Sequence, residues 1–116
     1  MIIQTLKLPA PESGRTMLRA LAVGYAKLGR KSLLILPSQS TWIEFSNQHG
    51  FESDFDVMSA KQALVAWKRG ALNAYDCILV DEISQSITAE GNLWDILIHA
   101  NGRRETVLVG SETESQ

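Results

Sequence analysis

The chain has only one cysteine, no excess of basic residues and no long hydrophobic run. Since a disulfide needs two cysteines, none can form within the chain, and this fits a reducing compartment. A formal net charge of -2 argues against a dedicated nucleic-acid coat, because phosphate binding needs clustered lysines and arginines. No run approaches the roughly 18 apolar residues of a membrane span, and the first residues lack a signal-peptide pattern. We therefore expect a cytoplasmic protein, of a cell or a virus-infected host, with no membrane partner.

The hydrophobic content predicts a compact fold. With 116 residues, of which 45% are hydrophobic, the chain can bury one core, and we expect a single domain over residues 1–116. Apolar strand-like runs alternate with helix-like segments. This alternation predicts right-handed crossovers and a parallel sheet between two helix layers. The expected fold class is α/β, a three-layer α/β/α sandwich with a mainly parallel sheet of four to five strands.

The expected elements follow from local patterns. Strands are expected at residues 2–8, 32–36, 55–58, 76–82 and 106–110. Helices are expected at residues 14–28, from a cap at Ser38 or Ser40 to an end near residues 47–50, after the capping-box pattern 59–62, and at 93–100. Residues 83–88 are expected to be a loop, and residues 111–116 a short acidic tail.

Helical spacing predicts which side chains enter the core. In the first helix, Met17, Leu21, Gly24 and Leu28 recur on one face, which Leu18 and Tyr25 widen. Each tryptophan lies on the apolar face of an expected helix, so we expect core packing rather than base stacking at Trp42, Trp67 and Trp94. Cys77 lies inside an apolar strand and is interpreted as a core residue.

The stretch Asp76–Glu82 is the most informative part of the chain. Cys77 to Val80 is an unbroken apolar run, typical of a strand buried on both faces, and Asp81 and Glu82 follow it directly. Ligand crevices in open α/β sheets lie at the carboxyl ends of the strands. The two carboxylates could therefore face a metal-bound substrate, or they could simply be solvated acids at the end of a strand.

A second segment could form a binding site together with these two carboxylates. Ser13-Gly14-Arg15-Thr16 joins the first expected strand to the first helix, where phosphate-binding proteins hold anions on backbone N–H groups. In that geometry a Thr hydroxyl at the helix start and an Asp at a neighbouring strand end share one Mg²⁺, and an adjacent Glu acts on the attacking water. Thr16, Asp81 and Glu82 match these roles by residue type and order.

With these residues the chain resembles the P-loop NTPases, and specifically the first RecA-like domain of superfamily 1 and 2 helicases and translocases. Residues 9–16 are similar to motif I, or Walker A, and residues 78–82 to motif II, or Walker B. Residues 34–40 are similar to motif Ia, residues 56–59 lie where motif Ib falls, and residues 107–113 take the place of motif III.

The resemblance implies a set of site residues. Glu12, Ser13, Gly14, Arg15 and Thr16 would bind the nucleotide. Thr16 and Asp81 would hold Mg²⁺ with ATP or GTP, and Glu82 would be catalytic. Ser38, Gln39 and Ser40 would contact nucleic acid, and Gly110 and Ser111 would form the motif III sensor.

The motif I segment departs from the family pattern at three positions. Pro9 replaces a small residue, Glu12 stands where the loop usually has Gly, and Arg15 replaces the lysine. Glu12 brings negative charge toward phosphate, and a guanidinium is bulkier than the ammonium that normally lies between phosphates. We therefore expect a helicase-type ATP-binding domain, in which nucleotide binding and hydrolysis are weakened.

Two interpretations follow. A helicase-type site closes between two domains, so a second domain or a protein partner would complete the site. The alternative is a non-catalytic scaffold or adaptor of the same fold that binds a protein partner or nucleic acid.

Overall fold

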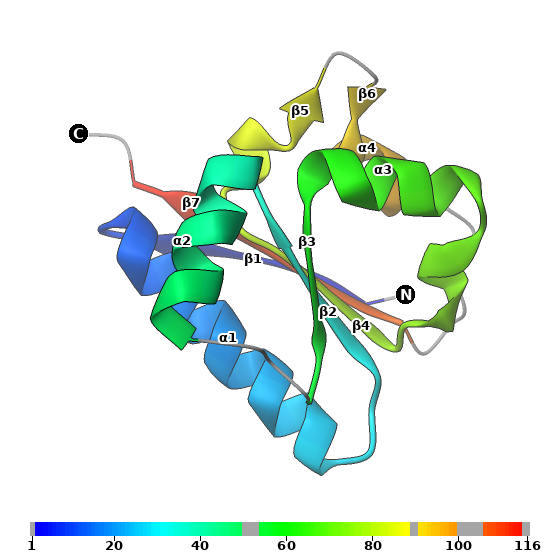
Figure 1. Ribbon diagram of the computed structural model, residues 1–116, viewed down its shortest axis with the longest axis horizontal. Coiled ribbons are helices and arrows are strands. Elements are labelled where there is room, and N and C mark those ends of the chain that lie inside the picture. The colour runs from blue at the N-terminus through cyan, green and yellow to red at the C-terminus, as the bar shows by residue number, and fades with distance from the viewer. Residues whose placement is uncertain (1, 50–53, 89–90, 100–105, 115–116) are drawn as a thin grey trace.

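The computed structural model describes residues 2–49, 54–88, 91–99 and 106–114. Within these ranges the chain forms helices and strands in alternation (Figure 1). In chain order they are β1 (Ile2–Leu8), α1 (Pro11–Lys27), β2 (Ser32–Leu36), α2 (Gln39–His49), β3 (Asp56–Ser59), α3 (Ala60–Lys68), the 3₁₀ helix η1 (Ala71–Ala74), β4 (Cys77–Val80), the 3₁₀ helix η2 (Ile83–Gln85), β5 (Ile87–Thr88), β6 (Gly91–Asn92), α4 (Leu93–His99) and β7 (Val107–Thr113).

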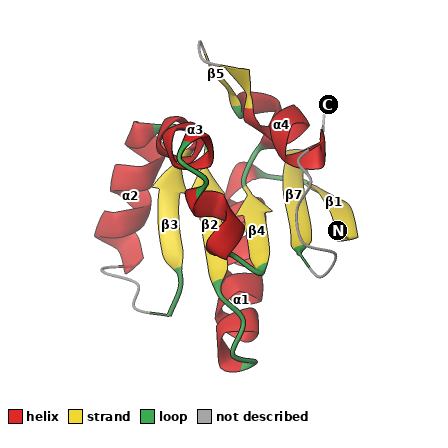
Figure 2. Cartoon of the chain, turned by 90° about the vertical axis from the view of Figure 1, so that its right-hand side faces the viewer, coloured by secondary structure: helices red, strands yellow, loops and turns green. Residues whose placement is uncertain are grey.

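The main sheet has five strands in the order β1-β7-β4-β2-β3, and every neighbouring pair is parallel. Figure 2 shows this order from β3 on the left to β1 on the right. The expected class is thus confirmed as an α/β fold with a mainly parallel sheet flanked by helices. Because all five strands run the same way, their carboxyl ends meet at one edge of the sheet.

Helices cover both faces of the sheet, which is compatible with a three-layer sandwich. In Figure 1, α1 and α2 lie together on the left, and α3 and α4 lie together at the upper right. Each pair has its own apolar cluster. Leu18, Leu34 and Phe45 belong to the cluster beneath α1 and α2, whereas Leu33 and Leu64 belong to the cluster beneath α3 and α4.

Side-chain caps mark the starts of three helices. Ser59 and Gln62 form both bonds of a capping box at α3, with side-chain to backbone distances of 3.2 and 2.9 Å. Of the two serines expected to cap α2, Ser38 does so, because its Oγ accepts the N–H of Thr41 at 3.2 Å. Asn92 likewise accepts the N–H of Asp95 at the start of α4.

Helix α1 begins at Pro11, so the expected start near residue 14 is wrong. Proline suits the first position of a helix, because its fixed φ is helical and its missing N–H would lack an intrahelical partner there. The expected buried face of α1 is confirmed at Leu18, which is fully buried, and at Leu21 and Tyr25, which pack against the core. It is wrong at Met17 and Leu28, which are 45% and 76% exposed.

Three further expectations need correction. Residues 83–88 are not an irregular loop, since they contain η2 and β5, and β5 pairs with β6. Ser111 to Thr113 belong to β7 rather than to an acidic tail, because β7 pairs with β1 over its whole length. Trp67 is 40% exposed and is not a core residue, while Trp42 and Trp94 pack against the two clusters.

None of the helices in the described ranges combines the length and the apolar character that a membrane crossing demands.

Candidate functional site

The carboxyl ends of β4 and β7 meet the first turns of α1. Gly14 is buried there, and a Cβ at this position would lie 3.0 Å from the Oγ of Ser111 and 3.4 Å from Oδ1 of Asp81. The missing side chain of Gly14 therefore lets α1 approach the strand ends closely. The two segments that the sequence singles out, residues 13–16 and residues 81–82, are neighbours in space.

Asp81 is the centre of this junction. Its side chain is fully buried and accepts two hydrogen bonds, from Nε of Arg15 at 3.0 Å and from Oγ of Ser111 at 3.1 Å. Burial raises the pKa of Asp81 above its usual range, although the bonds from Arg15 and Ser111 act in the opposite direction. Arg15 is 28% exposed and lies in the second turn of α1. A cation of the chain itself thus partly neutralises the acid.

Two hydrogen bonds connect Glu82 to β7. Its backbone N–H donates to Oγ of Ser111 at 3.1 Å, and its side chain accepts a bond from the Thr113 hydroxyl. Its φ is 50°, a left-handed conformation that residues other than glycine rarely adopt. The bonds to Ser111 and Thr113 compensate for this conformation, and they fix the carboxylate at the strand edge.

Thr113 is a site residue that the sequence analysis did not single out. Side chains alternate between the two faces of a strand, and this alternation could have identified Thr113. It places Thr113 on the same face of β7 as Ser111 and Val109. Gly110 points to the opposite face. A Cβ there would lie 2.5 Å from Cγ2 of Ile83 and 2.7 Å from Cη2 of Trp94. The close packing of Ile83 and Trp94 therefore explains why a glycine is needed at position 110.

The first turn of α1 differs from an open phosphate-binding loop. Only Pro9 and Ala10 separate β1 from α1, so residues 13–16 are helical. Pro11 has no N–H, and the N–H of Ser13 donates to the carbonyl of Ala10 at 3.1 Å. This turn consequently offers a phosphate fewer backbone donors than a loop would.

Thr16 is not brought to Asp81. Gly14, Leu18 and Ala22 form the buried face of α1, and Thr16 lies two residues from Gly14. At about 100° per residue, that spacing turns Thr16 to nearly the opposite side, where it is exposed. Arg15 is the residue of this segment whose side chain reaches the acid.

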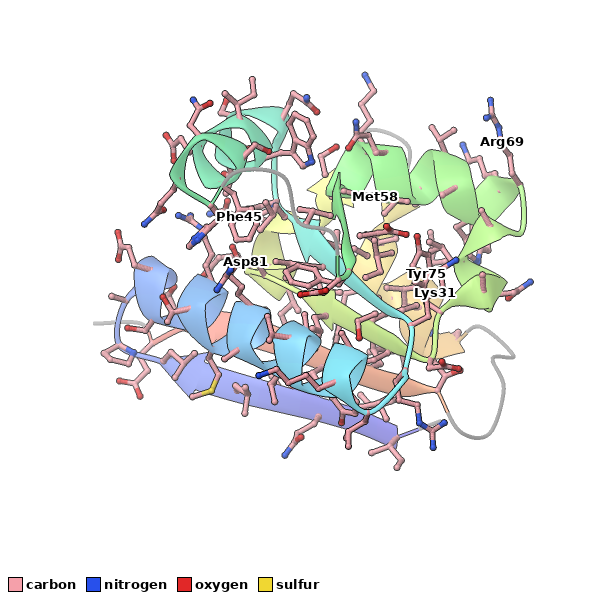
Figure 3. All side chains as sticks on the ribbon, turned by 60° about the horizontal axis from the view of Figure 1, so that its bottom comes forward. Lys31, Phe45, Met58, Arg69, Tyr75 and Asp81 are labelled. Atoms are coloured by element: carbon pink, nitrogen blue, oxygen red, sulfur yellow. The ribbon has the colours of Figure 1, made fainter. Side chains whose placement is uncertain are left out.

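A hollow of about 110 Å³ lies beside Arg15, between α1 and α2. It is lined by side chains of both helices: Glu12, Arg15, Thr16, Thr41, Glu44, Phe45, Gln48 and His49. Figure 3 shows Phe45 and Asp81 in the region between these helices. Ser38, Gln39 and Ser40 are exposed at the start of α2.

The candidate metal ligands are few. In the described ranges, no three His, Cys, Asp or Glu side chains converge in a way that could hold a metal ion. Asp81 and Glu82 are the acids at the strand edge, and both already accept hydrogen bonds from the chain. Mg²⁺ would fit beside Asp81 only if Arg15 moved away.

A second polar cluster lies at the amino ends of the strands. The Tyr75 hydroxyl donates to Oδ2 of Asp56 at 2.5 Å, and Nζ of Lys31 lies 5.0 Å from the centre of the Tyr75 ring. Figure 3 shows Lys31 beside Tyr75. Burial raises the pKa of Tyr75, and Asp56 raises it further. The cluster connects the beginnings of β2, β3 and β4, and we assign it a role in stability rather than in binding.

No protein-family model matches this chain, and no curated protein matches it. The interpretation of the site therefore depends on the chemistry of the residues described above.

Proposed function

We propose that the chain is a P-loop-type domain of the helicase and translocase class that binds Mg-ATP or Mg-GTP weakly. The phosphates would lie at the first turns of α1, against residues 12–16. Asp81 is the proposed metal ligand and Glu82 is the proposed catalytic acid–base residue, whereas Thr16 is turned away from Asp81 and is not proposed to share that metal. The observation that carries the proposal is the contact between Arg15 and Asp81, because it joins the two halves of the expected site.

Several features support weak binding rather than efficient turnover. Arg15 would have to exchange Asp81 for a phosphate, and this exchange costs the energy of a partly buried ion pair. The first turn of α1 offers few backbone donors, and Thr16 is turned away from Asp81. The bond from Thr113 would have to break before Glu82 could act on a water. We therefore propose that a second domain or a protein partner completes the site.

Calorimetric titration with Mg-ATP and Mg-GTP tests this proposal. The wild-type chain should give heat in the millimolar range, and Asp81→Asn should weaken it, whereas the exposed control Asp95→Asn should not. Glu12→Gly combined with Arg15→Lys should strengthen binding, because the acid is removed and the compact ammonium is restored. No heat from either nucleotide, with a folded chain by circular dichroism, would exclude nucleotide binding.

The second candidate function is a non-catalytic scaffold that binds a protein partner or nucleic acid. The start of α1 at Pro11 favours it, because residues 13–16 then form a regular helix rather than a phosphate loop. The Arg15–Asp81 bond also satisfies the buried acid without a ligand. A chain that is stable and gives no heat with nucleotides would favour this function.

Nucleic-acid contact is proposed at Ser38, Gln39 and Ser40, which are exposed at the start of α2. Binding of a labelled single-stranded oligonucleotide, followed by fluorescence anisotropy, should weaken with salt. At a fixed salt concentration, Ser40→Glu should weaken binding of the oligonucleotide, because the change adds negative charge near phosphate. Ser40→Ala is the neutral control. Affinity that is equal in both variants and insensitive to salt would rule out phosphate contact here.

A further inference from the structure

Strand β1 is an edge of the main sheet with a long unpaired side. It pairs with β7 along Ile2–Leu8, and in the described part of the chain no strand lies on its other side. Ile2 is 62% exposed and Ile3 is 45% exposed. The strand holds no proline, its register with β7 is regular, and Lys7 is its only charged residue. A long apolar edge of this kind pairs readily with another strand.

The direction of the backbone groups is fixed by two hydrogen bonds. The N–H of Ile2 donates to Thr106, and the carbonyl of Leu8 accepts from Glu114. Because backbone groups alternate in direction along a strand, the even-numbered residues of β1 bond to β7. The N–H and C=O groups of Ile3, Thr5 and Lys7 therefore point outward from the sheet.

We propose that β1 pairs antiparallel with β1 of a second copy of this chain, about a two-fold axis beside Thr5. In that register Thr5 faces Thr5 of the other copy, and Ile3 faces Lys7. The outward N–H and C=O groups of these residues then meet as hydrogen-bonded pairs. Two five-stranded sheets become one continuous sheet, and the interface has the self-complementary form that a two-fold dimer requires.

The side chains are complementary in the same register. On one face, the aliphatic stem of Lys7 would cover Ile3 of the other copy, and no lysine faces a lysine. On the other face, Ile2 would meet Leu8, and Leu6 would meet Gln4. The exposed isoleucines are therefore covered, and the only charge of the strand has no like-charged neighbour across the interface.

Analytical ultracentrifugation of the full chain over a wide concentration range tests the proposal. The wild-type chain should be a dimer that dissociates on dilution. Thr5→Pro should give a monomer, because it removes an outward N–H without touching the bonds to β7. Thr5→Val keeps that N–H and should remain a dimer. Circular dichroism would show that both variants fold.

Charge exchange tests the register. Ile3→Lys should weaken dimerisation by about tenfold, because it places two lysines opposite each other at both symmetry-related positions. Adding Lys7→Glu to Ile3→Lys should restore the dimer, because the same positions then carry opposite charges. A wild-type chain that is monomeric at every concentration, a dimer that Thr5→Pro leaves intact, or a failure of the charge exchange to restore association would each overturn the proposal.

Discussion

Nε of Arg15 donates to Oδ2 of Asp81 at 3.0 Å, and this bond ties the second turn of α1 to the carboxyl end of β4. The two residues differ in environment, since Asp81 is fully buried and Arg15 is 28% exposed. A carboxylate in the interior needs a partner far more than a guanidinium that reaches water. Removal of Arg15 and removal of Asp81 should therefore reduce the free energy of unfolding by different amounts.

Arg15→Ala should destabilise the fold more than Asp81→Asn. Without Arg15 the buried carboxylate keeps only the bond from Ser111, and we expect a loss of about 2–3 kcal/mol in the free energy of unfolding. Asp81→Asn removes the buried charge and leaves Arg15 partly hydrated, so its cost should be smaller. Urea unfolding measures both, with the exposed Arg69→Ala as control. Equal stability of Arg15→Ala and wild type would show that the bond contributes nothing.

The pH dependence of stability should reveal Asp81. Burial raises its pKa in the folded chain above the value in the unfolded chain, which is near 3.8. Between the two values the folded chain binds more protons, so this group's contribution to stability is lost as pH rises through that window. Relative to Asp81→Asn, the wild-type chain should be more stable at acid pH than at neutral pH. If the stability of the wild-type chain relative to Asp81→Asn rose with pH instead, the bond from Arg15 would have a larger effect on the pKa of Asp81 than burial.

The sequence predicts those parts of the fold that depend on local patterns. The unbroken apolar runs 33–36 and 77–80 are buried strands, and Ser59 with Gln62 forms the expected capping box. Parallel strands bring residues 81–82 to the edge where α1 begins, so the approach of the two candidate segments follows from fold class alone.

The partner of Asp81 could not be predicted in the same way. It depends on where α1 begins, because each residue turns a helix by about 100°. A helix that starts at Pro11 and buries Gly14 and Leu18 points Thr16 to solvent and leaves Arg15 within reach of the acid. The motif pattern gives the order of residues along the chain, but the rotation of the helix is set by its packing.

Cys77 should be unreactive in the native chain. The thiol is fully buried, and burial together with the neighbouring Asp76 raises its pKa to about 12. Since the thiolate is the nucleophile, a thiol-specific reagent at neutral pH should react only as fast as the chain opens. The rate should rise steeply with urea and follow unfolding seen by circular dichroism. Rapid reaction without denaturant would contradict the burial of β4.

Gly110 and Gly24 should respond in opposite directions to alanine. A Cβ at Gly110 would lie 2.5 Å from Ile83 and 2.7 Å from Trp94, whereas at Gly24 nothing lies within 4 Å. Gly110→Ala should therefore cost about 1–3 kcal/mol through overpacking. Gly24→Ala should stabilise the chain by about 0.5–1 kcal/mol, because alanine favours the helix.

Urea unfolding of the two variants measures this contrast. In a double-mutant cycle, Ile83→Ala should recover part of the Gly110→Ala loss, since it removes the Cγ2 methyl that the new Cβ would meet. Such recovery would show that Gly110 matters because Ile83 and Trp94 pack over β7. If Gly110→Ala were neutral in stability but changed nucleotide binding, the packing explanation would be wrong, and a role for Gly110 in the site would be favoured instead.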